Sequence, residues 1–237
     1  MVWKLYLLII MFNPINLEEL PNSSFNIVLG KRRSGKSYLT EYILEQMRLN
    51  KMVDVALLFT GTGAGFNMID KESRFKEIDK LNDVLENYRL FNEYNKVAKK
   101  SKQIKLKTVI ILDDLAVDLK SQKFNILEKL SVNGRHLAYA PLSLHFFILA
   151  QSLTKIPRVV RLNSDNIFLN QIASANEMNL VLDENIYILD GSLPGKREAR
   201  AYYQDLVVSK PFAFAVIENW RQNVTQLGDF VKIIVAT

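Results

Sequence analysis

"NIVLGKRRSGKSYL", residues 26–39, carries an apolar run into a glycine, then a basic turn, then Gly-Lys-Ser and a second apolar run. The stretch fits the phosphate-loop pattern G-x-x-x-x-G-K-[ST], with Gly30, Gly35, Lys36 and Ser37 at the fixed positions. A strand before this pattern and a helix after it are the context in which such a loop binds phosphate. The stretch therefore predicts a nucleotide-binding loop. The alternative is a basic turn that merely joins a strand to a helix.

Each residue type in this loop has a physical reason to be there. Gly30 and Gly35 let the backbone curl so that its N–H groups face the phosphates, and the helix beginning near Lys36 adds a partial positive charge. Lys36 is expected to reach the β- and γ-phosphates of ATP, and Ser37 to hold Mg²⁺. The side chains of the three basic residues Lys31, Arg32 and Arg33 are expected to point away into solvent. The expected cofactor-binding residues are Gly30, Lys31, Arg32, Arg33, Ser34, Gly35, Lys36 and Ser37.

A second apolar run ends in a pair of carboxylates. In "VIILDDL", residues 109–115, four apolar residues lead to Asp113 and Asp114. If this run is a parallel strand, its carboxyl end places both side chains beside the phosphate loop. Asp113 is the expected Mg²⁺ ligand, directly or through water, and Asp114 is expected to polarise the attacking water. The alternative is that the pair caps the next helix.

A polar side chain at the tip of a further strand is expected to touch the γ-phosphate and the water. "SLHFFILAQS", residues 143–152, has the composition of a buried strand. In additional-strand P-loop ATPases such a strand lies between the phosphate-loop strand and the acidic strand. Gln151 is the preferred candidate for the tip and Ser152 the alternative. His145, in the middle of the strand, is expected to belong to the core.

An arginine from a neighbouring subunit is expected to complete the site, because such a finger stabilises the charge that develops during phosphoryl transfer. "NGRH", residues 133–136, offers Arg135 as the first choice. Arg158 and Arg161 in "IPRVVR" are the alternatives. The expected catalytic residues are thus Lys36, Asp114, Arg135 and Gln151.

Apolar runs alternate with helical patterns along the chain. This alternation predicts βαβ units, and with the phosphate loop it predicts an α/β fold with a mainly parallel central sheet flanked by helices. One domain is expected over 1–237, with an apolar extension at 1–21 and, at 193–237, two late strands that extend the sheet or form a small cap on it. The expected strands cover 24–30, 53–61, 108–115, 143–152 and 165–170, and the expected helices 36–51, 72–102 and 124–137.

The composition is that of an ordinary globular protein of 237 residues, 49% hydrophobic and 24% charged. The absence of cysteine excludes a disulfide framework and a thiolate metal site. The net charge of +6 mildly favours an anionic partner such as nucleic acid. Basic segments at 96–107, 155–161 and 195–200 could follow a phosphate backbone, although a solvated face is the ordinary interpretation of each.

The amino-terminal segment Val2–Phe12 is apolar and superficially similar to a signal peptide. It has no small-residue cleavage site, and it is shorter than the roughly 20 apolar residues that a spanning helix needs. A buried core segment is therefore preferred to a membrane anchor, and no stable membrane insertion is expected. A translation start at Met11 instead of Met1 is a third alternative.

The order of these motifs resembles the DNA-packaging ATPases of large DNA viruses and virophages, which belong to the FtsK–HerA class of P-loop motors. Over about residues 22–170 the chain carries, in order, "GKRRSGKS", "VIILDDL", "NGRH", a strand ending in "AQS", and "IPRVVRLNSDNIF". The resemblance implies a three-layer P-loop NTPase fold of the ASCE or RecA-like type and ATP hydrolysis with Mg²⁺. It further implies a homo-oligomeric ring (pentamer or hexamer) and translocation of double-stranded DNA into a capsid. It also implies capsid or portal-vertex proteins as partners, in the virion or in the host cytoplasm at sites of virus assembly.

Other functions stay open on the sequence. The guanine-specific element N-K-x-D is missing, which argues against a small GTPase. A nucleoside or nucleotide kinase would want a second substrate pocket and an arginine-rich lid, which "GKREAR" (195–200) could imitate at an unexpected position. An FtsK–HerA-type DNA translocase that is not tied to a capsid is a further alternative. The intact pair of aspartates argues against an assembly protein that binds nucleotide with little hydrolysis.

Overall fold

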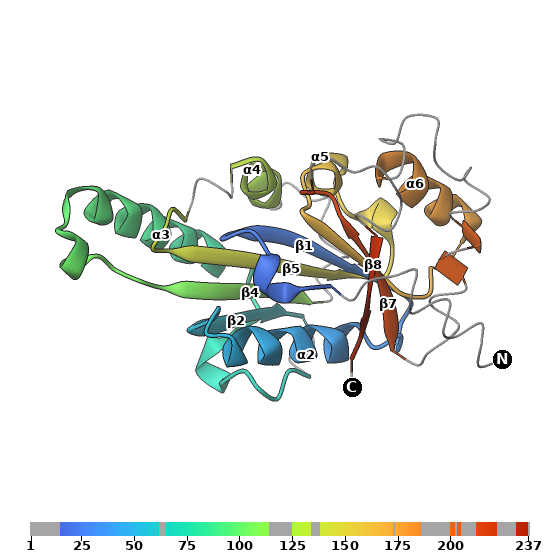
Figure 1. The fold of residues 1–237 in the computed structure, drawn as a ribbon, viewed down its shortest axis with the longest axis horizontal. Helices are drawn as coiled ribbons and strands as arrows, with labels where there is room; N and C mark the ends of the chain where they lie inside the picture. Colours follow the sequence, from blue (N-terminus) through green and yellow to red (C-terminus); the bar gives the residue numbers. More distant parts are fainter. Residues whose placement is uncertain are drawn as a thin grey trace.

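A mainly parallel sheet forms the centre of the protein (Figure 1). The computed structural model describes residues 15–61, 65–113, 125–133, 138–172, 174–185, 200–201, 203–204, 212–221 and 231–236. These residues form one eight-stranded sheet. Its strands are β1 (Ser24–Leu29), β2 (Val55–Thr60), β3 (Arg74–Phe75), β4 (Lys107–Asp113), β5 (Ser143–Ala150), β6 (Asn166–Leu169), β7 (Ala213–Glu218) and β8 (Val231–Val235).

The strand order β3-β2-β4-β5-β1-β6-β7-β8 places β5 between β1 and β4. Ile148 in β5 pairs with Ile27 on one side and with Leu112 on the other. The strands from β3 to β6 in this order are parallel, whereas β7 is antiparallel to β6 and β8 to β7. The expected three-layer fold with an additional strand is therefore confirmed, and the two late strands lie in the same sheet.

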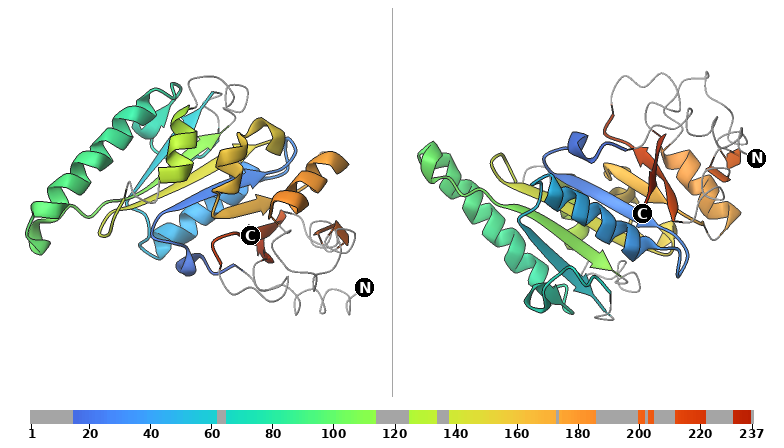
Figure 2. Two further views of the ribbon diagram at one scale, coloured as in Figure 1. Left: turned by 90° about the horizontal axis from the view of Figure 1, so that it is seen from above. Right: turned by 60° about the horizontal axis from the view of Figure 1, so that its bottom comes forward.

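Helices cover both faces of this sheet (Figure 1). In that view α2 lies below the sheet and the other four α-helices lie above it, and the right panel of Figure 2 shows α2 across the central strands. The α-helices are α2 (Lys36–Leu49), α3 (Lys80–Val97), α4 (Asn125–Asn133), α5 (Arg158–Leu162) and α6 (Ala175–Asn185). Short 3₁₀ turns are η1 (Leu17–Glu19), η2 (Lys71–Ser73), η3 (Lys100–Lys102) and η6 (Leu153–Lys155).

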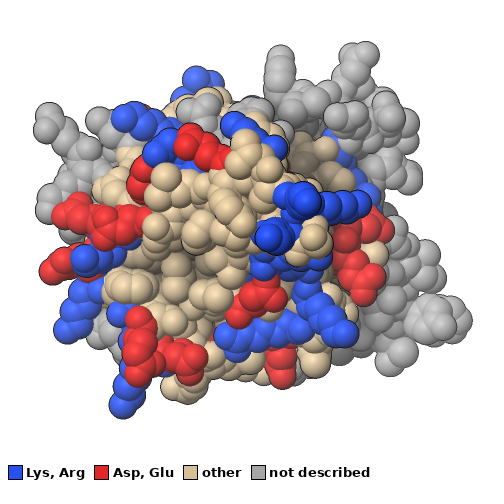
Figure 3. Space-filling view, turned by 90° about the vertical axis from the view of Figure 1, so that its left-hand side faces the viewer, with Lys and Arg blue, Asp and Glu red and all other residues tan. Residues whose placement is uncertain are grey.

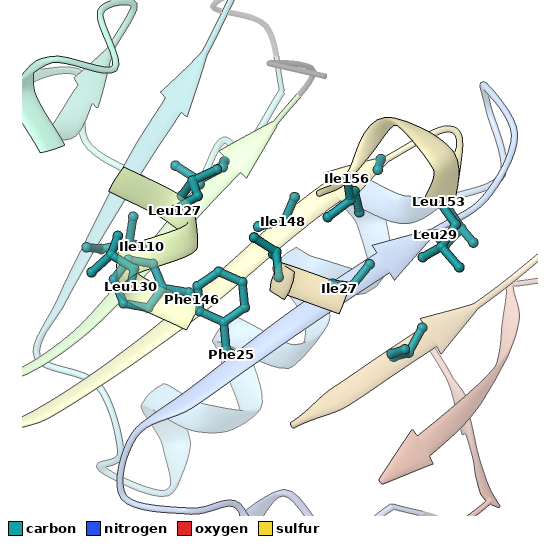
Figure 4. Close-up of a cluster of buried hydrophobic side chains, with 14 of the residues drawn as sticks. Phe25, Ile27, Leu29, Ile110, Leu127, Leu130, Phe146, Ile148, Leu153 and Ile156 are labelled. Atoms are coloured by element: carbon teal, nitrogen blue, oxygen red, sulfur yellow. The ribbon is translucent and has the colours of Figure 1, made fainter. Parts of the chain in front are cut away.

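Each face of the sheet has its own apolar core, because successive side chains of a strand point to opposite faces. On the upper face, Phe25 of β1 stacks on Phe146 of β5 with ring centroids 5.4 Å apart. Leu127 and Leu130 of α4 belong to the same cluster (Figure 4). All six side chains of β1 are buried, as a strand covered by helices on both faces requires.

The lower face packs against α2. Leu39, Ile43, Leu44 and Met47 are spaced so that they share one side of this helix, and all four are buried. Val28 of β1 belongs to the same cluster. Fully burying one such side chain stabilises the fold by about 1.5–3 kcal/mol. This packing fixes the direction of α2, and with it the position of the loop that leads into its first turn.

The long polar helix expected over 72–102 is shorter in the structure, where α3 covers only its central part. At the start, the Arg74 guanidinium donates hydrogen bonds to the Ile69 carbonyl at 2.8 and 3.0 Å, which holds Arg74 in an extended segment. At the end, the Asn95 side chain accepts from the Ile104 amide at 2.8 Å and donates to the Ile104 carbonyl at 2.9 Å. Side-chain contacts with backbone five and nine residues away therefore accompany the two ends of the helix.

The apolar segment 2–12 lies outside the described residues, as does the choice between Met1 and Met11. Within the part of the chain that the structure describes, none of the helices combines the length and apolar character needed to cross a membrane. The described chain starts at Ile15, whose amide donates to the Ile233 carbonyl of β8 at 3.1 Å. The two ends of the described chain therefore lie side by side at the edge of the sheet.

His145 lies in the core of β5, as expected, and is 2% exposed. Its Nδ1 is 2.8 Å from the Ser24 hydroxyl, and its Nε2 is 2.9 Å from the Ser143 hydroxyl. Burial lowers the pKa of this imidazole to about 4, because the charged form would have to give up its hydration. The fold therefore holds His145 neutral over a range of pH in which the unfolded chain protonates it.

We predict that His145 makes the stability of the fold depend on pH. The unfolded imidazole titrates near pH 6.5 and the folded one near 4, so its contribution is complete above pH 6.5 and is lost as the pH falls towards 4. Urea unfolding of the wild type should lose up to about 1.4 kcal/mol per pH unit in this window relative to His145→Gln. A difference between the two proteins that stays constant from pH 7 to 4.5 would contradict this assignment.

Candidate nucleotide-binding site

The candidate site lies where parallel strands end at one edge of the sheet. β1 leads into the loop at Gly30, β5 into Gln151, and β4 ends at Asp113. The Gly30 amide donates to the Ala150 carbonyl at 3.2 Å, so the beginning of the loop continues the pairing of β1 with β5. The carboxyl edge of a parallel sheet, where strand order reverses, is a recurring place for ligand binding.

The first half of the loop is held from two sides. The Lys31 amide donates to the Gln171 carbonyl at 3.0 Å, and the Ser34 amide donates to the Lys31 carbonyl at 3.2 Å. A Cβ atom at Gly30 would lie 2.4 Å from the Ser34 hydroxyl and 3.3 Å from Cβ of Asn170. Gly30 is therefore required by crowding, because the chain folds back onto it.

The second half of the loop turns into α2 at Gly35. Its φ of 87° lies in the left-handed region, where a glycine has no steric penalty. The Leu39 amide donates to the Gly35 carbonyl at 2.8 Å, so this residue also begins the hydrogen-bonding pattern of the helix. The amino-terminal end of a 14-residue helix thus faces the loop and favours an anion there.

Two side chains of the loop suit it to a phosphate ligand. The Lys36 ammonium donates hydrogen bonds to the Gly30 and Lys31 carbonyls, both at 2.9 Å, so its charge is held over the loop. The Ser34 hydroxyl is buried and has no hydrogen-bond partner among the described residues. A buried hydroxyl without a partner is unfavourable by roughly 1–3 kcal/mol, which a bound phosphate oxygen would relieve. The residues present therefore fit a nucleoside triphosphate.

The basic residues of the loop surround this cradle from outside. Lys31, Arg32 and Arg33 are exposed, whereas Ser37 at the start of α2 is half-buried. Arg33 has a φ of 63°, which turns its backbone into the left-handed region. The exposed charges raise the local positive potential and would attract an anion without contacting it at a fixed position.

Asp113 and Gln151 come to the same edge as the loop. Asp113 pairs with Thr60 of β2 and with Leu149 of β5, and it is half-buried. Gln151 is exposed and follows Ala150, the residue that pairs with Leu29 directly before the loop. Because β5 lies between β1 and β4, Gln151 is placed between the loop and the acidic strand. Asp114 lies outside the described residues.

The candidate arginine fingers are placed very differently. Arg161 is 8% exposed, and its guanidinium forms a two-point ion pair with Glu184, with both N–O distances 2.7 Å. The same guanidinium donates to the Ile156 carbonyl at 2.6 Å. Arg158 has a side chain that is 74% exposed and lies 3.7 Å from Glu184. Arg135 lies outside the described residues.

Asn163 and Asp165, which follow Arg161 in "IPRVVRLNSDNIF", also form hydrogen bonds within the fold. The Asp165 carboxylate accepts a hydrogen bond from the Phe25 amide at 2.8 Å, at the start of β1. The Asn163 side chain donates to the Val159 carbonyl at 2.7 Å, at the end of α5. Because β1 starts at the edge opposite the loop, both contacts lie away from the candidate site.

The basic segment 96–107 lies at the same far edge, because it leads into the beginning of β4. It forms the left-hand end of the molecule in Figure 1, and Figure 3 looks onto this end. Lysine and arginine side chains there are interspersed with aspartate and glutamate (Figure 3). The lysines of this segment therefore lie at an end of the molecule where acidic side chains from other parts of the chain also occur, opposite the candidate site.

The sequence patterns did not identify the residues that hold the loop in place from the β6–β7 side of the sheet. Asn170 follows β6, is 5% exposed and donates to the Ala213 carbonyl at 2.7 Å. The Tyr203 hydroxyl donates to the Asn170 carbonyl and accepts from the Ile172 amide. Phe212, at the start of β7, contacts Gly35. No motif marks these residues, because each acts through contacts that only the folded chain creates.

Solved structures of similar fold support this description. Over 90% of this chain and 97% of the other, it superposes on the genome packaging NTPase B204 of Sulfolobus turreted icosahedral virus 2, solved with ATP-gammaS, at a TM-score of 0.57 and 16% identity. The chain has the fold of a P-loop NTPase. No protein-family model and no curated protein matches it.

Two further structures extend this similarity of fold. The pCW3 conjugation coupling protein TcpA, solved with ATPgS, matches with a TM-score of 0.57 and 16% identity over 94% of this chain and 69% of its own. ATPases 2 and 3 of EssC from Geobacillus thermodenitrificans match with a TM-score of 0.51 and 10% identity over 90% of this chain and 40% of theirs. The shared feature is the P-loop NTPase fold.

We predict that Gly35→Ala weakens nucleotide binding at least about ten-fold, because the loop must shift. The new Cβ would lie 2.7 Å from the Phe212 ring at a φ of 87°. Gly65→Ala is the matched control: its φ is 85° and nothing lies within 4 Å. Isothermal titration with ATP should separate the two variants. Equal affinities of the two variants would show that crowding at Gly35 does not affect nucleotide binding, and would contradict the prediction.

Proposed function

We propose that this protein is a Mg²⁺-dependent ATPase of the FtsK–HerA class that translocates double-stranded DNA and packages a viral genome into a capsid. One observation carries the ATPase assignment: Gln151 directly follows β5, which lies between β1, the strand before the phosphate loop, and the acidic strand β4. A glutamine in this place can contact both a γ-phosphate and an attacking water, which a site built only for binding does not need.

The residues of the site would each have a separate role in hydrolysis. Lys36 would exchange its two carbonyl partners for the β- and γ-phosphates, and the loop amides would surround the same phosphates. Ser37 and Asp113 would hold Mg²⁺, which supplies charge neutralisation on the phosphate oxygens when it is bound. Asp114 would orient and polarise the water, with Gln151 contacting it from β5.

A homo-oligomeric ring, a pentamer or a hexamer, would complete each site with an arginine of the neighbouring subunit. Arg161 is poorly suited to this role, because its guanidinium is buried against Glu184. Arg135 is therefore the preferred finger, with the exposed Arg158 second. Such a group raises turnover by about 10³–10⁵ in other NTPases, because it stabilises charge that develops only in the transition state.

The proposed partners are double-stranded DNA and capsid or portal-vertex proteins, in the virion or in the host cytoplasm where virus assembles. The likeness to a viral genome packaging NTPase supports this assignment. The likeness to a conjugation coupling protein supports a second candidate, a DNA translocase that is not tied to a capsid. Both candidates share the motor and differ only in the partner to which the ring is attached.

We predict that ATP hydrolysis requires Mg²⁺ and is stimulated by double-stranded DNA. Phosphate release should rise on addition of duplex and disappear with Lys36→Ala, which removes the charge held over the loop. Asp114→Asn should bind ATP but hydrolyse it poorly, because the water is no longer polarised. Stimulation by a nucleoside in place of DNA would instead identify a phosphotransferase.

The assignment of the arginine finger has its own test. Mixing Arg135→Ala with Lys36→Ala protein should restore ATPase activity, because some sites then combine an intact loop with an intact finger. Arg161→Ala should instead lower the free energy of unfolding by about 3 kcal/mol, since the buried Glu184 would lose its two-point ion pair and keep only the longer contact with the exposed Arg158. Absence of any recovery in the mixtures would make Arg135 a structural residue.

A further inference from the structure

Two exposed aromatic rings lie together beside the phosphate loop. Tyr38 is 46% exposed and Phe212 is 48% exposed, and their ring centroids are 5.3 Å apart at an interplanar angle of 55°. Tyr38 belongs to the first turn of α2, directly after Ser37. Single exposed aromatics are common on protein surfaces, but a pair that adjoins a ligand site indicates a contact surface.

Phe212 is held in this place by the fold. It precedes β7, which is antiparallel to β6, so it lies at the same sheet edge as the phosphate loop. The hydrogen bond from Asn170 to the Ala213 carbonyl ties the adjacent residue to the end of β6. Its own φ of 58° is unusual for a bulky side chain. Such strained positions collect at ligand sites, where the surroundings hold them.

The position of the pair relative to the loop indicates which part of a nucleotide it meets. The groups suited to hydrolysis, Asp113 and Gln151, lie on the β4–β5 side of β1. Phe212 lies on the opposite side, where β6 and β7 follow β1 in the sheet. A nucleotide with its γ-phosphate towards Gln151 therefore extends its ribose and base towards the aromatic pair.

We propose that Phe212, supported by Tyr38, stacks against the base of the bound nucleotide; this rests on the proposed ATPase function. Base–aromatic stacking needs only a π-face on the ligand, and the described residues at the pair offer the rings themselves as the recognition surface. The surface therefore favours purines, which have the larger face, over pyrimidines. It contributes affinity for the nucleoside part and leaves the phosphate contacts to the loop.

The test compares ATP with inorganic tripolyphosphate, which has the phosphates and lacks the base. Phe212→Leu retains an apolar side chain against Gly35 but loses the aromatic face. It should weaken ATP binding by about ten-fold and leave tripolyphosphate binding within about two-fold of wild type. Phe212→Tyr should keep wild-type affinity for both. Tyr94→Ala, a ring 46% exposed on α3, is the matched control and should change neither affinity.

Each other result overturns the inference. Unchanged ATP affinity in Phe212→Leu would show that the ring does not contact the base. An equal loss for ATP and tripolyphosphate would show that the ring only supports the loop through Gly35. A wild-type protein that binds neither ligand would overturn the proposed ATPase function as well. The first two results leave that function intact, so the two failures are distinguishable.

Discussion

The parallel pairing of β5 with both β1 and β4 is the constraint on which the rest of the site depends. Because parallel strands end at the same edge, this pairing brings the phosphate loop, Gln151 and Asp113 together although they are far apart in sequence. Both faces of β5 are buried, so a shift of one residue would exchange the side chains that pack into the two apolar cores. The fold and the arrangement of the candidate site thus depend on the same register.

The loop itself is positioned by what surrounds it. β5 holds its first residue through the Ala150 carbonyl, and the segment after β6 holds its second through Gln171. Gly30 and Gly35 lie where neighbouring side chains approach so closely that a Cβ atom would collide with them. Rigid support on both sides keeps the loop amides arranged before a ligand binds, which reduces the entropy that binding has to overcome.

The structure separates residues that look alike in sequence. Arg158 and Arg161 lie one turn apart on α5, yet one is exposed and the other is buried in an ion pair with Glu184. Glu184 comes from α6, so no local pattern distinguishes the two arginines. The ends of α3 differ from the expected bounds for a local reason, because Arg74 and Asn95 bond to backbone five and nine residues away and not at helical spacing. Local propensity describes the middle of an element better than its ends.

The sequence by itself determined the phosphate loop, the acidic strand, the strand ending in Gln151 and the α/β class. These features are encoded in residue type and spacing within single segments, which is where hydrophobic period and backbone freedom act. Only the tertiary structure decided that the two late strands continue the sheet beyond β6, which arginine is buried, and that Phe212 lies against Gly35. The last two outcomes depend on contacts between residues 23 and 177 positions apart, and no pattern within one segment predicts the free energy of such contacts.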